Sequence, residues 1–529
     1  MDHSEHRAAG SPESWVTTHV SRRRALFLGL TVVPSVALMG ACQTAPPEAN
    51  AAPAATPGEA AASSTPGHDV RDFGAVGDGV ADDTDAVQSL IDAAAASGTA
   101  GVVSPGTFRC TRSLLLPANA RLHLAAGARL VKDWAVTPGL ANAFLRNVDF
   151  AVKSNGVDIS GTGSIGATDH SRTGVILAVY GDDVRLRDFT IDTYAGGQAI
   201  MFSGDRGRID NVRIVNSAPG FGTGGIRMIG GVEFVATGCH VESGDDCLQF
   251  VPIGDPGALL FNQSISRSSY IGCTGVSSMS RFMVALLEWT RGDGGLSASV
   301  SDCSFVSCSG RGANRGIVVK NTHSSGALER ISFTDCTVDM AGSEDRQAQE
   351  IRVQTDPTSG GSIRDITFTR TNITNAVNPA LRVGGPNISR LRFEGCVFPA
   401  PSGTATAGMV VDSARSVTFR DCAFPGATGK RQLTVGPQEV VTGLSLVNCQ
   451  FDDIADRQWA VNLVTTRSPR VVGCTFREAA GGAGRALRIA STTSDALVRD
   501  CDFTGVTSPL KLQDQGVRTV LRDNVGLTA

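Results

Sequence analysis

The sequence is poor in aromatic residues, in charge and in long helical patterns. Aromatic side chains make up 5% of the 529 residues, and charged side chains make up 19%. The net charge is −4, so the composition predicts neither a nucleic-acid partner nor a basic surface for an anionic membrane. No G-x-S-x-G, H-E-x-x-H or phosphate-loop motif occurs, which leaves serine hydrolase, zinc protease and nucleotide chemistry without a basis.

Small and β-branched residues take the place of the missing types. The chain contains 61 glycines and is crowded with Val, Ser, Thr and Ala. This profile favours many short strands separated by tight turns. The length is enough for a large core and for more than one ordinary domain.

The first 42 residues read as an export signal. Three arginines, Arg22 to Arg24, precede an apolar run from Ala25 to Ala41, whose 17 residues fall short of the about 20 that a membrane span needs. This pattern resembles a bacterial twin-arginine signal, and Leu38 to Cys42 resembles a lipoprotein cleavage box. We therefore expect export to the outer face of the bacterial cell membrane through a lipid on Cys42, with simple cleavage and secretion as the alternative. The membrane would be reached only through this lipid.

Residues 43–68 are rich in proline, alanine and small polar residues, which cannot bury a core. They predict a disordered linker between the signal and a domain that covers 69–529.

A short sequence motif around cysteine recurs through the rest of the chain. It occurs at Cys239, Cys273, Cys303, Cys336, Cys396, Cys422, Cys449, Cys474 and Cys501. The steps are 25 to 34 residues, except for one step of 60 in which RTNITN near Thr371 fills the missing place. A period of this length with short β runs predicts a solenoid. Thirteen cysteines in an exported chain also allow disulfides, but one cysteine per turn at one repeat position favours a reduced, inward-facing column.

The predicted solenoid begins with a capped helix. Asp83 and Thr84 can cap a helix that is apolar on one face and that stops at Gly98. The stretch VRDFGAVGDG…DDTDAVQ followed by SPGTF resembles the N-terminal cap of pectate-lyase-like proteins. The resemblance implies an all-β fold, a right-handed parallel β-helix with a short N-terminal capping helix.

Two adjacent carboxylates, Asp245 and Asp246, stand in SGDDCLQF, although GDD also occurs at Gly181–Asp183. The stretch from about Val157 to Lys320 resembles the polygalacturonase family, glycoside hydrolase family 28, whose signatures are NTD, GDD, GHG and RIK. SGDDCLQF matches the second signature. The others are altered, because Gly224 stands for the expected aspartate, Arg281 for the histidine, and Val318 for the arginine before Lys320.

The resemblance implies that Asp245 is a general acid and Asp246 a base, which is the pairing that inverting glycosidases use. Arg227 and Arg281 would join Lys320 around the cleft and bind an anionic sugar. Tyr270 and Trp289 offer flat faces for a sugar ring, and Glu288 is the nearest candidate to replace the missing aspartate.

Three functions follow as alternatives. The first is a glycoside hydrolase acting on a polysaccharide without a metal or cofactor. The second is a polyuronate lyase with Arg281 or Lys320 as base and a possible calcium requirement. The third is a non-catalytic glycan-binding protein. The oligomeric state stays open between monomer and trimer.

Overall fold

A computed structural model describes residues 67–135, 142–220, 222–252, 263–287, 297–322, 324–342, 350–356, 360–426, 429–455 and 457–527. Cys42, Glu288 and Trp289, which carry three of the expectations above, lie outside the described residues. Within the described ranges, no helix has the length and apolar character needed to cross a membrane.

The N-terminal cap is built as the sequence predicts, with one difference. After β1 (His68–Asp69), η1 (Val70–Phe73) and β2 (Asp78–Asp82), helix α1 (Thr84–Ser97) buries one apolar face and ends at the left-handed Gly98. The carboxylate of Asp83 does not cap the helix. It accepts hydrogen bonds from the backbone N–H groups of Val76 and Gly77, at 2.7 and 3.1 Å, and so fixes the loop before α1.

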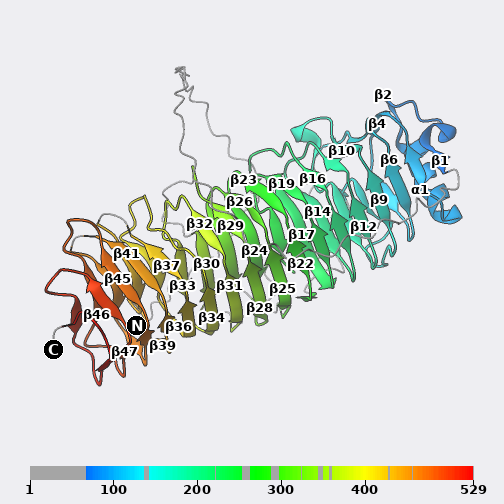
Figure 1. Cartoon of the computed structure of the whole chain (residues 1–529). Coiled ribbons are helices and arrows are strands. Elements are labelled where there is room, and N and C mark those ends of the chain that lie inside the picture. The colour runs from blue at the N-terminus through cyan, green and yellow to red at the C-terminus, as the bar shows by residue number, and fades with distance from the viewer. Residues whose placement is uncertain are drawn as a thin grey trace, which may run out of the picture. The chain divides into compact units, whose positions relative to one another are not determined.

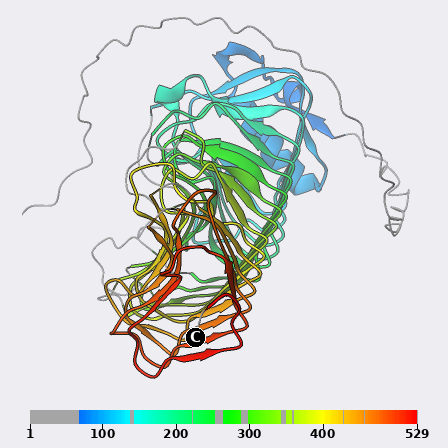
Figure 2. The same ribbon diagram turned by 60° about the vertical axis from the view of Figure 1, so that its left-hand side comes forward.

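From there the chain winds as a right-handed parallel β-helix, and every named strand pairing is parallel (Figure 1). Helix α1 lies at one end of the stack of coils and β50 (Val520–Arg522) at the other, and Figure 2 shows how the coils superpose. Each coil contributes strands to three faces.

The first face carries the candidate site. Its strands are β5 (Leu114–Leu116), β8 (Leu145–Asn147), β11 (Leu177–Tyr180), β14 (Gln198–Ser203), β17 (Gly224–Val232), β20 (Leu248–Phe250), β24 (Arg281–Leu287), β27 (Arg315–Asn321), β30 (Ile351–Thr355), β33 (Leu381–Gly384), β35 (Ala407–Val411), β38 (Arg431–Val435), β42 (Trp459–Leu463), β46 (Arg485–Ile489) and β49 (Leu512–Asp514).

The second face is continuous with the first, because β17 pairs with β20 at one end and with β21 at the other. After β1 its strands are β3 (Gly101–Val103), β6 (Arg121–Leu124), β9 (Asp158–Gly161), β12 (Arg185–Arg187), β15 (Arg208–Asp210), β18 (Val235–Thr237), β21 (Ile265–Ser266), β22 (Ser269–Ile271), β25 (Val300–Val306), β28 (Ala327–Thr334), β31 (Ser362–Thr369), β34 (Ile388–Glu394), β36 (Ala414–Arg420), β39 (Val441–Thr442), β40 (Ser445–Val447), β43 (Thr466–Arg467), β44 (Arg470–Val472), β47 (Leu497–Arg499) and β50.

The third face consists of an 11-stranded and a 4-stranded sheet. After β2 its strands are β4 (Gly106–Cys110), β7 (Ala128–Lys132), β10 (Ser164–Ala167), β13 (Thr190–Ile191), β16 (Arg213–Ile214), β19 (His240–Ser243), β23 (Thr274–Ser277), β26 (Ser309–Gly312), β29 (Thr337–Asp339), β32 (Asn372–Thr374), β37 (Ala423–Pro425), β41 (Gln450–Ile454), β45 (Thr475–Glu478) and β48 (Asp502–Gly505).

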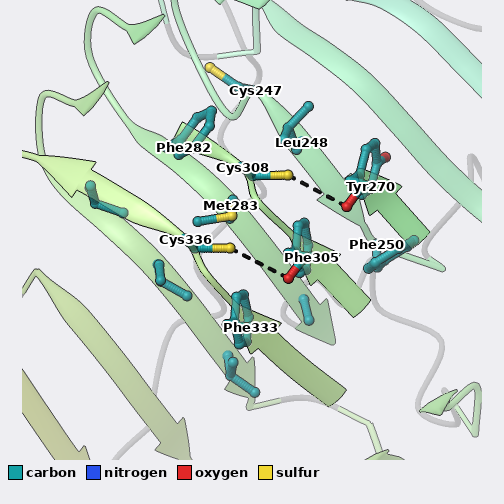
Figure 3. Close-up of a cluster of buried hydrophobic side chains, with 14 of the residues drawn as sticks. Cys247, Leu248, Phe250, Tyr270, Phe282, Met283, Phe305, Cys308, Phe333 and Cys336 are labelled. Atoms are coloured by element: carbon teal, nitrogen blue, oxygen red, sulfur yellow. Dashed lines mark hydrogen bonds between the residues drawn. The ribbon is translucent and has the colours of Figure 1, made fainter. Parts of the chain in front are cut away.

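The cysteine column is confirmed, and its cysteines are free and buried in the described part of the chain. Each thiol donates to the carbonyl of a residue one coil earlier, as Cys308 does to Tyr270 and Cys336 to Phe305 (Figure 3). Thr371 takes the missing place, because its hydroxyl donates to the carbonyl of Phe333 at 3.0 Å.

One member of the predicted column is wrong. Cys303 lies inside β25, in register with Ile331, and Cys308 occupies the column instead. The residue before each column position has a positive φ, as Ser307 has before Cys308, so the column follows a left-handed corner of the coil.

An aromatic column fills the core beside the cysteines. The rings of Phe305, Phe333, Phe368, Phe393 and Phe419 stack with centroid spacings of 4.7 to 4.9 Å. Tyr270 begins this column, since its ring stacks on Phe305 at 5.4 Å. Each such contact contributes about 0.5–1.5 kcal/mol beyond the burial of apolar area.

Candidate functional site

The two adjacent aspartates occupy the turn that carries the chain from β19 on the third face to β20 on the first. Gly244 is required there, because a Cβ at this position would lie 2.6 Å from the backbone nitrogen of Gly220. The N–H of Asp245 donates to the carbonyl of Thr223, and the carboxylate of Asp245 accepts the N–H of Gly222 at 2.7 Å. Asp245 is 9% exposed, so its carboxyl is fixed at the boundary between protein and solvent.

Asp246 forms a buried, bidentate ion pair with Arg281. Nε and Nη2 of Arg281 lie 2.6 and 2.7 Å from the two carboxylate oxygens, and the hydroxyl of Ser280 donates to Oδ1 at 3.0 Å. Asp246 is 2% exposed and Arg281 8%. Burial raises the pKa of Asp246, and the positive charge of Arg281 opposes this rise. Arg281, which stands in the place of the family's histidine, thus engages both oxygens of the predicted base.

Arg227 lies close enough to both aspartates to interact with their charges. Its side chain is buried, and burial lowers the pKa of Arg227 to about 10, while the charges of Asp246 and Asp245 oppose the change. The structure therefore brings together four of the predicted site residues: two carboxylates and two guanidinium groups.

Sequence reasoning missed Gln198 and Gln249. A Cβ added at Gly224 would lie 2.1 Å from Oε1 of Gln198, so the Gln198 side chain fills the space beside the position where the family has its third aspartate. Nε2 of Gln249 donates to Oε1 of Gln198 at 2.9 Å and to the carbonyl of Asp246 at 2.7 Å. Gln198 lies 26 positions before Gly224, which is one coil, so the repeat period was the signal that could have found it.

Lys320 does not converge with this cluster. The register aligns Leu248 with Met283 and Met283 with Ile317, which puts Lys320 two strands away from Asp246 and five residues further along the strand direction. With about 4.8 Å between strands and about 3.3 Å per residue, the two Cα atoms are roughly 19 Å apart. Its cross-strand neighbours are Leu286 and Gln354.

The other GDD, at Gly181–Asp183, is a surface turn. Asp182 pairs with Lys153 at 2.8 Å, and Asp183 forms an exposed bidentate pair with Arg206. The hydrogen bonds from Arg206 lower the pKa of Asp183, the opposite direction to that of Asp246. The same three letters therefore give one buried and one solvated environment.

The prediction that Tyr270 contacts substrate is wrong. Its side chain is buried inside the coil, and its hydroxyl donates to the carbonyls of Ile226 and Gln249, each at 3.0 Å. A second tyrosine, Tyr194, is buried in the same way with its hydroxyl on the carbonyl of Glu242. The tyrosines thus satisfy backbone carbonyls within the core, a use that the sequence argument did not allow.

No group of three or more His, Cys, Asp or Glu side chains among the described residues is arranged to hold a metal ion. Both oxygens of Asp246 are already engaged by Arg281, so this carboxylate does not offer a calcium ligand.

Comparisons with known proteins bear on the fold. Residues 68–123 match the model of the family "rhamnogalacturonase A/epimerase, pectate lyase-like". A stretch of 131 residues is 28% identical to the mannuronan C5-epimerase AlgE4 of Azotobacter vinelandii, and it spans 24% of this chain and 19% of that enzyme. The predicted resemblance to pectate-lyase-like proteins is confirmed.

Solved structures agree on the architecture. The tailspike protein of E. coli bacteriophage HK620, crystallised with a pentasaccharide, has a TM-score of 0.52 at 12% identity, over 86% of this chain and 80% of that one. An exopolygalacturonase from Thermotoga maritima has a TM-score of 0.42 at 13% identity, over 69% of this chain and 90% of that one. The likeness to the tailspike confirms the parallel β-helix as the fold.

Proposed function

We propose that the protein cleaves an acidic polysaccharide on the first face of the coil, by hydrolysis of a glycosidic bond with Asp245 as the general acid. One observation carries the proposal: the carboxyl of Asp245, 9% exposed, is held by the N–H of Gly222 next to the ion pair of Asp246 with Arg281 and interacts with the charge of Arg227. Guanidinium groups suit the carboxylate of a uronate, and a neighbouring carboxyl suits proton donation to the leaving oxygen. The oligosaccharide-bound tailspike and the mannuronan-modifying relative support a polysaccharide as substrate.

In this reaction Asp245 gives its proton to the glycosidic oxygen, and the bond from that oxygen to the anomeric carbon breaks. The oxygen of a water molecule bonds to the anomeric carbon, and a base accepts the proton of that water. Asp246 serves as the base only by releasing one of its bonds from Arg281. The amide of Gln198, which fills the space of the family's third aspartate, orients the water.

A second candidate, β-elimination at a uronate, is favoured by the lowered pKa of Arg227 and by the engagement of Asp246. Arg227 would take the proton from C5, the bond from C4 to the glycosidic oxygen would break, and a C4–C5 double bond would form. Asp245 would protonate the leaving oxygen. Because the pKa of Arg227 is about 10, the neutral fraction of Arg227, and with it the rate of this reaction, rises as the pH rises towards 10.

The test incubates the full chain with polygalacturonate, with alginate and with a neutral β-glucan. Reducing ends and the ultraviolet absorbance of unsaturated uronates are both recorded. The variant Asp245→Asn is compared with Asp183→Asn, which alters the second aspartate of the surface GDD and serves as the matched control. Reducing ends without absorbance, lost in Asp245→Asn and kept in Asp183→Asn, are the expected result.

An ultraviolet absorbance of unsaturated uronates that rises with pH would show that the reaction is elimination and not hydrolysis. Equal activity of both variants would exclude Asp245 from the chemistry. A chain that binds these polymers and changes none of them would be a glycan-binding protein.

We propose a location on the outer face of the bacterial membrane with a lipid on Cys42, which the resemblance of the first 42 residues to an export signal supports. Metabolic labelling with palmitate tests this: wild type incorporates the label and Cys42→Ser does not. An unlabelled wild-type protein in the medium would mean secretion instead.

A further inference from the structure

A hollow opens on the first face, beyond the site, where β30 and β33 lie side by side. Its volume is about 270 Å³, and its walls include Arg352, Gln354, Arg382 and Asp412. The register places β30 three strands and β33 four strands beyond β20, the strand that follows Asp246. None of these residues belongs to the cluster around Asp245.

The hollow exists because one outward position has no side chain. Gln354 is in register with Gly384, and the pairing of Val383 with Val411 puts Asp412 next in the same row. A Cβ at Gly384 would come no closer than 3.5 Å to Asp412, so glycine is not required there for the backbone or for space. The missing side chain therefore leaves a gap one strand wide, with an acceptor group on each side.

The two acceptors are incompletely satisfied. Oδ2 of Asp412 accepts a hydrogen bond from Nε of Arg382 at 2.8 Å, but its Oδ1 is buried and has no hydrogen-bond partner. Oε1 of Gln354 is buried without a partner as well. Asp412 is only 5% exposed. Buried polar atoms almost always have partners, so two orphaned oxygens beside one hollow indicate donors that a bound molecule brings.

Two arginines border the same hollow, together with a second carboxylate, Glu439. Arg352 and Arg382 are directly in register on neighbouring strands, about 4.8 Å apart at the backbone. They lie two residues before Gln354 and Gly384, and Nε of Arg382 reaches Oδ2 of Asp412, so the guanidinium groups and the acceptor oxygens border the hollow together. The volume is below the about 300–1,000 Å³ of drug-sized pockets, which suits a single sugar ring.

We propose that this hollow is a second carbohydrate subsite that takes one uronate unit of the polysaccharide. Its ring hydroxyls donate to Oδ1 of Asp412 and Oε1 of Gln354, and its carboxylate binds Arg352 and Arg382. The inference rests on the proposed function for its polymer, because a chain held here and at Asp245 occupies one continuous face. A polymer that reaches both sites binds more tightly than a short oligomer, since the second contact is intramolecular.

The test measures binding by calorimetry with the full chain carrying Asp245→Asn, so that the ligand is not consumed. Polygalacturonate is compared with its methyl-esterified form, which keeps the hydroxyls and loses the charge. Gly384→Leu fills the hollow and Arg352→Gln removes one cation. The matched control is Arg488→Gln, which alters an arginine in the same outward row as Arg352 and Arg382, four strands beyond Arg382.

The expected result is a loss of at least tenfold in affinity in Gly384→Leu and in Arg352→Gln, with less than twofold change in Arg488→Gln. The esterified polymer binds at least tenfold more weakly than polygalacturonate. Circular dichroism shows that each variant is folded, and Arg352→Gln carries the test if Gly384→Leu is not.

Three results would each overturn the subsite. The first is full affinity in Arg352→Gln and in a folded Gly384→Leu, and the second is equal binding of the esterified polymer. The third is no binding by the protein that retains Gly384 and Arg352. Product formation that ignores the Gly384 change would keep the proposed hydrolysis and reject only the subsite. Binding that depends on Gly384, without product from the chain that retains Asp245, would keep the subsite and reject the proposed hydrolysis.

Discussion

Replacing Arg281 by methionine tests the central feature of the site, the buried ion pair with Asp246. The variant keeps an unbranched apolar side chain and removes the guanidinium group, whose nitrogens lie 2.6 and 2.7 Å from the two carboxylate oxygens. Breaking a buried pair in this way costs about 3–5 kcal/mol, because the remaining charge is left without its partner. We expect Arg281→Met to lower the free energy of unfolding by this amount at pH 8.

The loss depends on pH, and its sign follows from the direction of the pKa shift. Burial raises the pKa of Asp246 above its ordinary value of 3.8, so the folded state holds this proton over a pH range in which the unfolded state has released it. Stability therefore falls as the pH rises through that range. Arg281 opposes the rise in the pKa of Asp246, so removing Arg281 raises this pKa further. The loss of unfolding free energy in Arg281→Met is therefore larger at pH 8 than at pH 4.5.

The assay is equilibrium unfolding of the full chain in urea at pH 4.5 and pH 8, followed by circular dichroism. The control is Arg370→Met, which removes an equally bidentate pair with Asp335 whose side chains are 60% and 42% exposed. We expect no shift of the midpoint in the control, since solvent screens exposed pairs. Adding Asp246→Leu to Arg281→Met recovers most of the loss. An equal loss at both pH values, or one no larger than in the control, would refute a buried charge as its cause.

Three further outcomes follow from single contacts. Gly224→Asp combined with Gln198→Ala, which removes the side chain 2.1 Å from the new Cβ, restores the family's third carboxylate and raises the release of reducing ends at least tenfold over Gln198→Ala alone. Burial raises the pKa of Glu350 to about 7, so stability falls by on the order of 3 kcal/mol between pH 4.5 and 7, and urea unfolding of Glu350→Gln lacks this slope. Thr371→Val loses the hydrogen bond to Phe333 and about 1 kcal/mol in the same assay, whereas Thr371→Cys matches wild type.

The fold was predictable because the sequence repeats with the period of one coil. A small residue must face inward at the same corner of every coil. Cysteine fills this position in enough coils for its spacing alone to give the length of the repeat. The error at Cys303 shows the limit of the method. Two cysteines in one coil are both buried, and each follows a residue with a positive φ, Asp302 or Ser307. Only the hydrogen bond from the thiol of Cys308 to the carbonyl of Tyr270, one coil earlier, identifies the column residue, and the letters DCSF do not contain it.

The residues of the site were predictable as candidates, but the hydrogen bonds and ion pairs between them were not. Asp246 and Arg281 are 35 residues apart, about one coil, so the period could have suggested that they meet. What it could not give is the direction of the side chains. Tyr270 illustrates this, since the strand pattern allows either side and the carbonyls of Ile226 and Gln249 hold it inside.

Two of the three departures from the polygalacturonase pattern, at Gly224 and Arg281, change the charge of the cluster. Three carboxylates around one cleft would repel an anionic sugar unless cations offset them. This chain replaces one carboxylate by Gly224 and adds Arg281, so that Asp245 and Asp246 face the guanidinium groups of Arg227 and Arg281, two charges against two. The cluster gains electroneutrality and loses the free base, because Arg281 engages the carboxylate that would have activated water. Proton donation from Asp245 serves both proposed reactions, whereas water activation by Asp246 requires this carboxylate to release one of its two bonds from Arg281.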